Sequence, residues 1–381
     1  MKLLKSESVI VLSIILLGLT IRLVNIGFPL LEYFPERQTQ TAEITRNIYK
    51  NGWPDFWAPK VRYFTGYPIP YVLEFPLYNG IVAGLYYLFG PNVIWGRIMS
   101  LIFFSLSGIV FYKLVKRNFS QGVATLSTFF FSLSPLGILV SRTFQPESLL
   151  LLLFLLSLYY RSFLIFSLTL LVKFPIIIFS PLLFITDNQF KINIRKLTKL
   201  FLSISPILLW IAHGKIYTTY PGIAVNYQLS NWFDPKLYIN PRWYFSLFQI
   251  EHIWVFTTLG LVLFWIGLWR MNRKKHFFWF AWLVNFIFYF IIFNRHAAIH
   301  EYYHLLILPP ASASVGLGLH SLIGIFNRLS KLKKTIAVLI FLIVLSLNLI
   351  SPALRKILAS PTSPGVGNDI SPARYQYIED F

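Results

Sequence analysis

The sequence contains no cysteine and few acidic residues. The missing cysteine excludes disulfide bonds and thiolate metal sites. Asp and Glu together number 14, against 34 Lys and Arg, so the formal net charge is +20. Charged residues of both signs make up only 13% of the chain, whereas hydrophobic residues make up 56%. Soluble domains rarely have this balance, so the composition indicates a membrane protein.

The basic residues lie in short clusters between long apolar runs. This pattern fixes the orientation of a membrane protein, with the clusters on the cytoplasmic side. We therefore expect no nucleic-acid partner, although a surplus of positive charge also occurs in nucleic-acid-binding proteins. The clusters are Lys2/Lys5, Lys113/Lys116/Arg117, Lys191/Arg195/Lys196/Lys199, Arg270/Arg273/Lys274/Lys275 and Arg328/Lys331/Lys333/Lys334.

Apolar runs near membrane-spanning length recur along the whole chain. A long apolar stretch between residues 148 and 185 is interrupted by Arg161 and Lys173, and three crossings there would leave roughly 13 residues each, against about 20 for a full crossing. With all basic clusters on one side, the prediction is about nine to eleven transmembrane helices. The other predicted spans are residues 9–26, 93–115, 123–140, 200–212, 253–269, 277–293, 305–326 and 335–350.

The chain is thus predicted to be an all-α polytopic membrane protein, with residues 1–351 forming one transmembrane domain. Residues 27–92 form a long first outer loop, and residues 213–252 form a second large outer loop. Within the first loop we expect interfacial helices, one from residue 41 to about Asn51-Gly52 and one at residues 75–89. Residues 352–381 are expected to form a short outer tail rich in Pro, Gly and Ser.

The first loop concentrates the scarce carboxylates. Five of the 14 acidic residues lie in it, among basic residues, and this mixture suits a phosphorylated substrate. A solvated loop with a surface helix explains the same residues without a function, so both interpretations stay open. The acidic residues are Glu32, Glu36, Glu43, Asp55 and Glu74, and the basic ones include Arg37, Arg46, Lys60 and Arg62.

Two further polar interruptions carry candidate site residues. Glu147 follows Pro146, which places it in the first turn of a helix, where an acid is favourable in any case. The functional interpretation is that Glu147 faces Glu36 across a cavity while Arg142 binds a phosphate. Lys173 interrupts an apolar stretch, so it either has a partner or faces water, or its side chain snorkels to the membrane surface.

A third polar turn, residues 294–304, places His300 and His304 at helical i, i+4 spacing with Glu301 between them. A zinc pair is conceivable at this spacing. However, the order differs from that of a zinc protease, and the sequence offers no clear third ligand.

In their order and spacing, these segments resemble the membrane glycosyltransferases of the GT-C class. The most similar family groups bacterial protein O-mannosyltransferases with the lipid A aminoarabinose transferase and is glycosyltransferase family 39-like. The matching segments are RQTQTAEITRN at 37–47, EFPLYN at 74–79, LFG at 88–90 followed by Arg97, SRTFQPE at 141–147, Lys173, and HEYY at 300–303 leading to Pro309.

The resemblance implies a polyprenyl-phosphate-sugar donor bound between membrane helices, with an acidic residue of the first loop acting at the acceptor. Relatives carry an acidic pair just after the first helix, and here that pair falls on Arg37-Gln38. Glu36 is the nearest carboxylate and is our predicted base, with Glu43 and Glu74 as alternatives.

The chemistry needs a carboxylate to take the acceptor proton and cations to stabilise the departing phosphate. Direct displacement needs one base and no covalent intermediate, which predicts inversion at the sugar carbon. Some relatives use a divalent metal, and Glu36 with Glu147 are the candidate ligands for Mg²⁺ or Mn²⁺; the sequence does not decide whether a metal is needed. The candidate substrate- and phosphate-binding residues are Arg37, Gln38, Arg62, Arg142, Lys173, His300, Tyr302 and Tyr303.

The predicted function is transfer of a sugar from a polyprenyl-phosphate donor at the outer face of the cytoplasmic (inner) membrane. The acceptor, a glycan, a lipid or a protein, stays open. One alternative is a transporter or flippase for a polyprenyl-linked glycan, but the expected paired interruptions in two halves are not found. The other is a non-catalytic subunit of a glycan-assembly complex, which the missing acidic pair keeps open.

Overall fold

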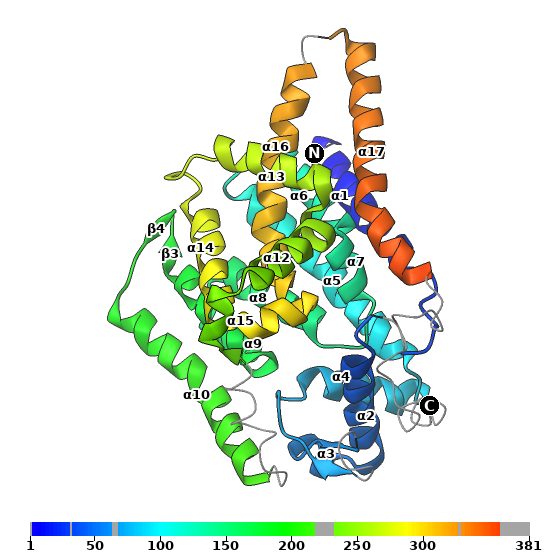
Figure 1. Ribbon diagram of the computed structural model, residues 1–381, viewed down its shortest axis with the longest axis vertical. Helices are drawn as coiled ribbons and strands as arrows, with labels where there is room; N and C mark the ends of the chain where they lie inside the picture. Colours follow the sequence, from blue (N-terminus) through cyan, green and yellow to red (C-terminus); the bar gives the residue numbers. More distant parts are fainter. Residues whose placement is uncertain (1, 31–32, 63–67, 218–231, 327–328, 359–381) are drawn as a thin grey trace.

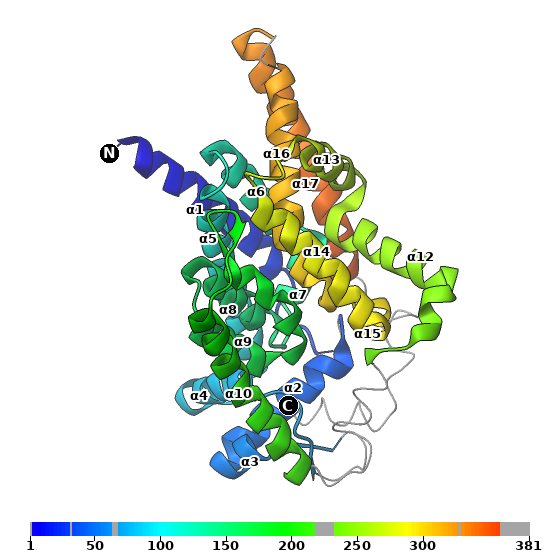
Figure 2. The same ribbon diagram turned by 90° about the vertical axis from the view of Figure 1, so that its left-hand side faces the viewer.

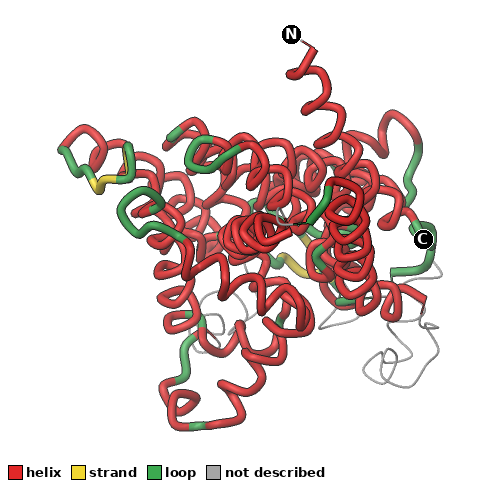
Figure 3. Tube along the Cα trace, turned by 90° about the horizontal axis from the view of Figure 1, so that it is seen from above, coloured by secondary structure: helices red, strands yellow, loops and turns green. Residues whose placement is uncertain are grey.

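The computed structural model describes residues 2–30, 33–62, 68–217, 232–326 and 329–358. Helices make up almost all of this part of the chain, and strands form only two short antiparallel hairpins (Figure 3). β1 (Lys60–Val61) pairs with β2 (Ile69–Pro70), and β3 (Ile185–Thr186) pairs with β4 (Gln189–Phe190). The predicted all-α class is confirmed.

The helices of the described residues follow one another with short connections. They are α1 (Lys2–Leu23), α2 (Pro35–Asn51), α3 (Trp53–Trp57), α4 (Leu77–Phe89), α5 (Ile94–Lys116), α6 (Gln121–Leu133), α7 (Pro135–Ser141), α8 (Glu147–Tyr160), α9 (Phe163–Val172), η1 (Phe174–Phe184), α10 (Ile194–Tyr217), η2 (Pro235–Ile239), α12 (Pro241–Ile250), η3 (Glu251–Phe256), α13 (Thr257–Arg270), α14 (Phe277–Ile292), α15 (Asn294–Ile299), η4 (Glu301–Ile307), α16 (Leu308–Ile325) and α17 (Lys331–Leu358).

Over the described residues, five helical runs are long and apolar enough to cross a membrane, or six if α6 and α7, bent by 57°, are one broken span. The predicted count of about nine to eleven is therefore too high by this criterion. The physical reason is that several apolar runs fold as helices of 10–17 residues, shorter than a full crossing. The multi-pass membrane character is confirmed.

The breaks in the apolar stretch at 148–185 fall where the polar residues predict them. Arg161 adopts a left-handed conformation (φ 51°) after α8, and the Ser162 side chain caps the start of α9. Lys173 is extended between α9 and η1, and Pro175 follows it. Pro175 has no N–H group to donate to the Leu171 carbonyl four residues earlier, so α9 ends at Val172, and Lys173 leaves the helical path.

The first loop folds as α2, α3 and α4 together with the β1–β2 hairpin. α2 ends at Asn51 before Gly52, which has φ 71°, as predicted, but it begins at Pro35 and not at residue 41. In Figure 1 these helices lie at one end of the molecule, and α16 and α17 extend from the opposite end. Figure 2 shows α10 on the side of α9, also at the end that carries α3.

The predicted outer tail and the predicted second outer loop both contain helical residues. The tail does not begin at residue 352, because α17 runs on to Leu358. Its buried residues Leu345, Leu349, Ala353 and Ile357 recur every four positions, so one apolar face continues past Pro352. The predicted second loop contains η2 and α12. Residues 218–231 of that loop and residues 359–381 of the tail lie outside the described part.

Glycines allow three central helices, α6, α13 and α16, to pack with their backbones in close approach. A Cβ at Gly267 of α13 would lie 1.8 Å from the Ser314 oxygen of α16, and one at Gly318 of α16 would lie 2.1 Å from the Leu263 oxygen of α13. Both distances are far below any van der Waals contact. Small residues that let helix backbones approach in this way are typical of packing inside membranes.

We therefore expect Gly318→Ala to lower the thermal unfolding midpoint of the detergent-purified protein. The added methyl group forces α13 and α16 apart, an overpacking effect of about 1–3 kcal/mol. Gly324→Ala, in the same helix, is the matched control, because a Cβ there meets nothing within 4 Å. Equal midpoints for the two variants would show that the close approach does not matter for stability.

Candidate functional site

Lys173 and Glu147 form a buried ion pair. The Lys173 Nζ lies 2.8 Å from the Glu147 Oε1, and their side chains are only 9% and 1% exposed. The ammonium also lies over the rings of Tyr302 and Tyr303, 4.6 and 4.4 Å from their centroids. A carboxylate and two aromatic faces thus surround the charge. Lys173 therefore has a partner in the protein and does not snorkel.

The ion pair joins segments that are distant in the sequence. Glu147 is the first residue of α8, as predicted, and Lys173 stands in the break between α9 and η1. Tyr302 and Tyr303 belong to η4. Because an unpaired charge away from water is costly, the pair holds these three segments in one arrangement.

A second ion pair, between Arg37 and Glu74, is more exposed. The Arg37 Nη2 donates to the Glu74 Oε2, and its Nη1 donates to the Gln40 Oε1 at 3.2 Å. The side chains are 17% and 28% exposed. Burial by itself would lower the pKa of Arg37, but the carboxylates of Glu74 and Glu147 outweigh it and hold that pKa above its ordinary value. Arg37 is therefore a permanent cation.

Coulombic interactions connect the two ion pairs. Lys173 interacts with Glu74 and Arg37 as well as with Glu147, and Glu147 also interacts with Arg37. We call Arg37, Glu74, Glu147 and Lys173, with Tyr302 and Tyr303, the polar cluster. Two carboxylates and two cations alternate in it, so it holds no net charge.

His300 borders the polar cluster, with its ring stacked on Tyr302 at 5.2 Å between centroids. Burial lowers the pKa of His300 to about 3, helped by His296 and by the positive charges of Lys173 and Arg37. The ring is therefore neutral at physiological pH, and it stacks on Tyr302 and Tyr303 as an uncharged group.

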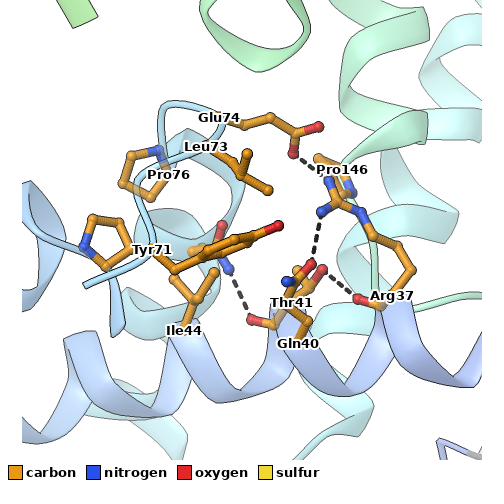
Figure 4. A pocket seen from close by; sticks show the side chains of 11 residues that line it. Arg37, Gln40, Thr41, Ile44, Tyr71, Leu73, Glu74, Pro76 and Pro146 are labelled. Atoms are coloured by element: carbon orange, nitrogen blue, oxygen red, sulfur yellow. Dashed lines mark hydrogen bonds and ion pairs between the residues drawn. The ribbon is translucent and has the colours of Figure 1, made fainter. Parts of the chain in front are cut away.

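A small pocket, partly open to solvent, lies beside the Arg37–Glu74 pair (Figure 4). Four of its lining residues, Arg37, Gln40, Thr41 and Ile44, follow the i, i+3, i+4, i+7 spacing of one face of α2. The sequence contains this signal, but the prediction did not use it. The remaining lining residues are Pro59, Tyr71, Leu73, Glu74, Pro76, Asn79 and Pro146.

Gln38 and Arg142 connect the segments around the pocket through hydrogen bonds to the backbone. The buried Gln38 amide donates to the Tyr33 carbonyl at 2.8 Å and accepts from the Phe144 N–H at 3.0 Å. Arg142, also buried, donates from its Nη2 to the Asn25 carbonyl at 3.1 Å. These contacts fix the 141–147 turn against the start of α2 and the end of α1, and neither residue lines the pocket.

The other predicted residues of the first loop do not line the pocket. Glu36 is exposed in the first turn of α2, and Arg62 is exposed after β1. Glu43 is buried, and its two carboxylate oxygens accept from the Arg62 backbone N–H at 3.0 and 3.2 Å. None of the three lines the pocket, and Glu43 holds the β1–β2 hairpin on α2. Glu32 lies outside the described residues.

Prediction also missed a contact between the buried His304 ring and the partly buried Glu251 carboxylate. The His304 Nδ1 lies 2.7 Å from the Glu251 carboxylate, and its Nε2 lies 2.8 Å from the Ala297 carbonyl oxygen. The ring therefore joins η3, which carries Glu251, to α15, which carries Ala297. This engagement leaves His304 unsuited to a zinc pair with His300.

A metal held by Glu36 and Glu147 does not fit this arrangement. Glu147 is engaged by Lys173, and Glu36 stands on the exposed surface of α2. In the part of the chain that the structure describes, no three His, Asp or Glu side chains gather in a way that would hold a metal ion.

The family model of dolichyl-phosphate-mannose-protein mannosyltransferases matches residues 74–213, a segment that includes Glu74, Glu147 and Lys173. A comparison with curated proteins found no match. The family match supports the resemblance expected from the sequence.

Solved structures of GT-C enzymes share the fold. ArnT from Cupriavidus metallidurans bound to undecaprenyl phosphate matches with a TM-score of 0.57 and 14% identity, over 86% of this chain and 62% of that chain. The Archaeoglobus fulgidus oligosaccharyltransferase in complex with Zn and sulfate matches with a TM-score of 0.52 and 13% identity, over 94% and 54%. Archaeoglobus fulgidus AglB with an inhibitory peptide and a dolichol-phosphate matches with a TM-score of 0.50 and 13% identity, over 94% and 56%.

The chain thus spans less than two thirds of the length of these solved structures. At such identities the likeness concerns the fold, and it confirms the predicted GT-C-like architecture.

The buried ion pair makes a testable prediction. Glu147→Gln leaves the Lys173 ammonium without its counter-charge and should lower the free energy of unfolding by about 3–5 kcal/mol. The double variant Glu147→Gln/Lys173→Met should lose less than the sum of the single variants, because neither charge remains. The measurement is a double-mutant cycle of thermal unfolding in detergent.

The Glu7–Lys116 pair between α1 and α5 is the control for this cycle, because its lysine side chain is 41% exposed. There we expect a coupling of about 0–1 kcal/mol. Additive losses at Glu147 and Lys173 would contradict the role given to the buried pair.

Proposed function

We propose that this protein transfers a sugar from a polyprenyl-phosphate donor to an acceptor hydroxyl group, with inversion at the sugar carbon. One observation carries the proposal: the pocket presents a guanidinium and a carboxylate side by side, on Arg37 and Glu74. The first is the side chain best suited to a phosphate, and the second is suited to accept a proton.

In the proposed reaction, the donor phosphate takes the place of the Glu74 carboxylate on Arg37. Glu74 then accepts the proton of the acceptor hydroxyl as its oxygen forms a bond to the sugar carbon. The bond from that carbon to the phosphate oxygen breaks on the opposite face, and its electron pair leaves with the polyprenyl phosphate. Arg37 stabilises the departing phosphate charge.

Glu74 replaces Glu36 as the proposed base because of its position. Glu74 lines the pocket, and the Phe75 N–H next to it donates to the Leu171 carbonyl at 3.1 Å, which fixes this part of the loop on α9. Glu36 lies on the same turn of α2 as Arg37 but on its exposed face. A base has to reach the acceptor within hydrogen-bond distance, and Glu74 is the carboxylate that can do so from the pocket wall.

Two considerations support a lipid-linked donor and an outward-facing site. The solved ArnT structure contains undecaprenyl phosphate, and the AglB structure contains a dolichol-phosphate. Lys331, Lys333 and Lys334 begin α17 at the end of the molecule opposite to α2 and α4 (Figure 1). If these lysines follow the positive-inside rule, the pocket faces the outer side of the cytoplasmic membrane.

The test is transfer of a labelled sugar by the purified protein, with a panel of undecaprenyl-phosphate hexoses and pentoses as donors and cell-envelope extract as acceptor. Glu74→Gln should lower kcat by about 10²–10⁴-fold, because the amide does not accept the proton. Glu36→Gln should retain activity within about twofold, since its side chain does not reach the pocket.

Loss of activity in Glu36→Gln with activity retained in Glu74→Gln would return the role of base to Glu36. Absence of transfer from every donor in the panel would reject a transferase and favour a transporter or a non-catalytic subunit.

A further inference from the structure

The pocket beside Glu74 is divided into a polar side and an apolar side. In Figure 4 the polar ends of Glu74, Arg37 and Gln40 gather on one side, whereas Ile44 and Pro76 lie on the other. A ligand that fills it needs hydrogen-bonding groups along one edge and an apolar surface along the other. A pyranose or furanose ring has both, in its hydroxyl edge and its C–H face.

The pocket lining offers both donors and acceptors. The Asn79 Nδ2 donates to the Thr41 carbonyl at 2.8 Å and to the Thr45 hydroxyl at 3.1 Å. These contacts fix the amide orientation, and no hydrogen bond from another described residue reaches its Oδ1. Gln40 accepts from Arg37 through its Oε1, which leaves the two N–H groups of its Nε2 for a ligand.

These donors and acceptors suit the adjacent hydroxyl groups of a sugar, because each hydroxyl both donates and accepts a hydrogen bond. Gln40 supplies donors, and Glu74 and the Asn79 Oδ1 supply acceptors, whereas Arg37 binds the donor phosphate in the proposed reaction. The Tyr71 ring crosses the pocket between the two sides (Figure 4). Its apolar face suits the C–H groups of a sugar ring.

The backbone of the pocket wall does not suit a peptide. Three of the eleven lining residues are prolines, Pro59, Pro76 and Pro146, and these have no N–H group. The Tyr71 N–H is already bonded to the Pro59 carbonyl at 2.6 Å. Grooves that bind extended peptides rely on unpaired main-chain groups, and this wall offers side chains in their place.

We propose that this pocket binds one sugar unit of the acceptor, so that the acceptor of the reaction is a carbohydrate hydroxyl. The polar and apolar lining residues match the hydroxyl edge and the C–H face of one monosaccharide unit. The inference rests on the proposed function for the role of Glu74. Gln40 and Asn79 then act as specificity-determining residues that orient the acceptor hydroxyl toward that carboxylate.

The experiment measures binding, without donor, to the full-length protein in detergent. A panel of methyl glycosides and an acetylated, amidated Ser/Thr hexapeptide are compared by saturation-transfer-difference NMR and titration. At least one glycoside should bind, and Gln40→Ala should weaken its Kd by about tenfold through the lost hydrogen bonds. Gln189→Ala, in the exposed β4 strand, is the matched control and should bind as the wild type does.

Tyr71→Leu provides a second variant, with Tyr71→Phe as its conservative partner. Leu removes the ring and should weaken the Kd by about tenfold, whereas Phe keeps the ring and should restore most of the binding. If no glycoside binds, or if neither Gln40→Ala nor Tyr71→Leu changes the Kd of the glycoside, the inference is wrong. Binding of the hexapeptide that depends on Gln40 would likewise overturn it in favour of a protein acceptor.

Cleavage of the labelled donor by water, measured on the same preparations, tests the proposed function separately. A protein that cleaves donor but binds no glycoside would keep the transferase proposal and reject the carbohydrate acceptor. A protein that binds a glycoside through Gln40 but never cleaves donor would keep the sugar pocket and reject both the transferase and the acceptor role.

Discussion

The Lys173 ammonium is held away from water between the Glu147 carboxylate and two tyrosine rings, and the arrangement of the site depends on this contact. Each element that meets there is short or broken: α8 begins at Glu147, α9 stops at Lys173, and η4 carries the tyrosines. Burying either charge without its partner in an apolar environment would cost several kcal/mol of free energy, on the order that desolvation of an ion requires. Their pairing therefore fixes where these segments end and which way they face, and the first loop packs on the result.

The two ion pairs of the polar cluster differ in their exposure: the Glu147–Lys173 pair is buried, and the Arg37–Glu74 pair is partly exposed. The Glu147–Lys173 pair is enclosed, so a substrate would have to displace a carboxylate and two rings to reach the ammonium. The Arg37–Glu74 pair is open to the pocket, and an anion can replace the carboxylate there with little loss of burial. Substrate chemistry is thus expected on the open pair, with the enclosed pair supplying rigidity.

Local rules in the sequence predicted the features that depend on neighbouring residues. These include the breaks at Arg161 and Lys173 and the end of α2 before Gly52, since proline, glycine and buried charge act within a few positions. Partners across the fold were not predictable in this way: Glu74 was one of three candidate carboxylates, and only its place beside Arg37 distinguishes it. Over the described residues, the count of spans by length and composition is lower than predicted. Basic clusters indicate on which side a segment lies and not how long each helix is, and several apolar runs fold as helices of 10–17 residues.

The central claim is that the Arg37–Glu74 pair opens to receive the phosphate of a lipid-linked substrate. A cryo-EM structure of the protein in nanodiscs with undecaprenyl phosphate tests it most directly. The account predicts phosphate density within hydrogen-bond distance of the Arg37 guanidinium, with the Glu74 carboxylate moved off Arg37 and the Glu147–Lys173 pair intact. Phosphate density elsewhere on the protein, with Arg37 still bonded to Glu74, would contradict it.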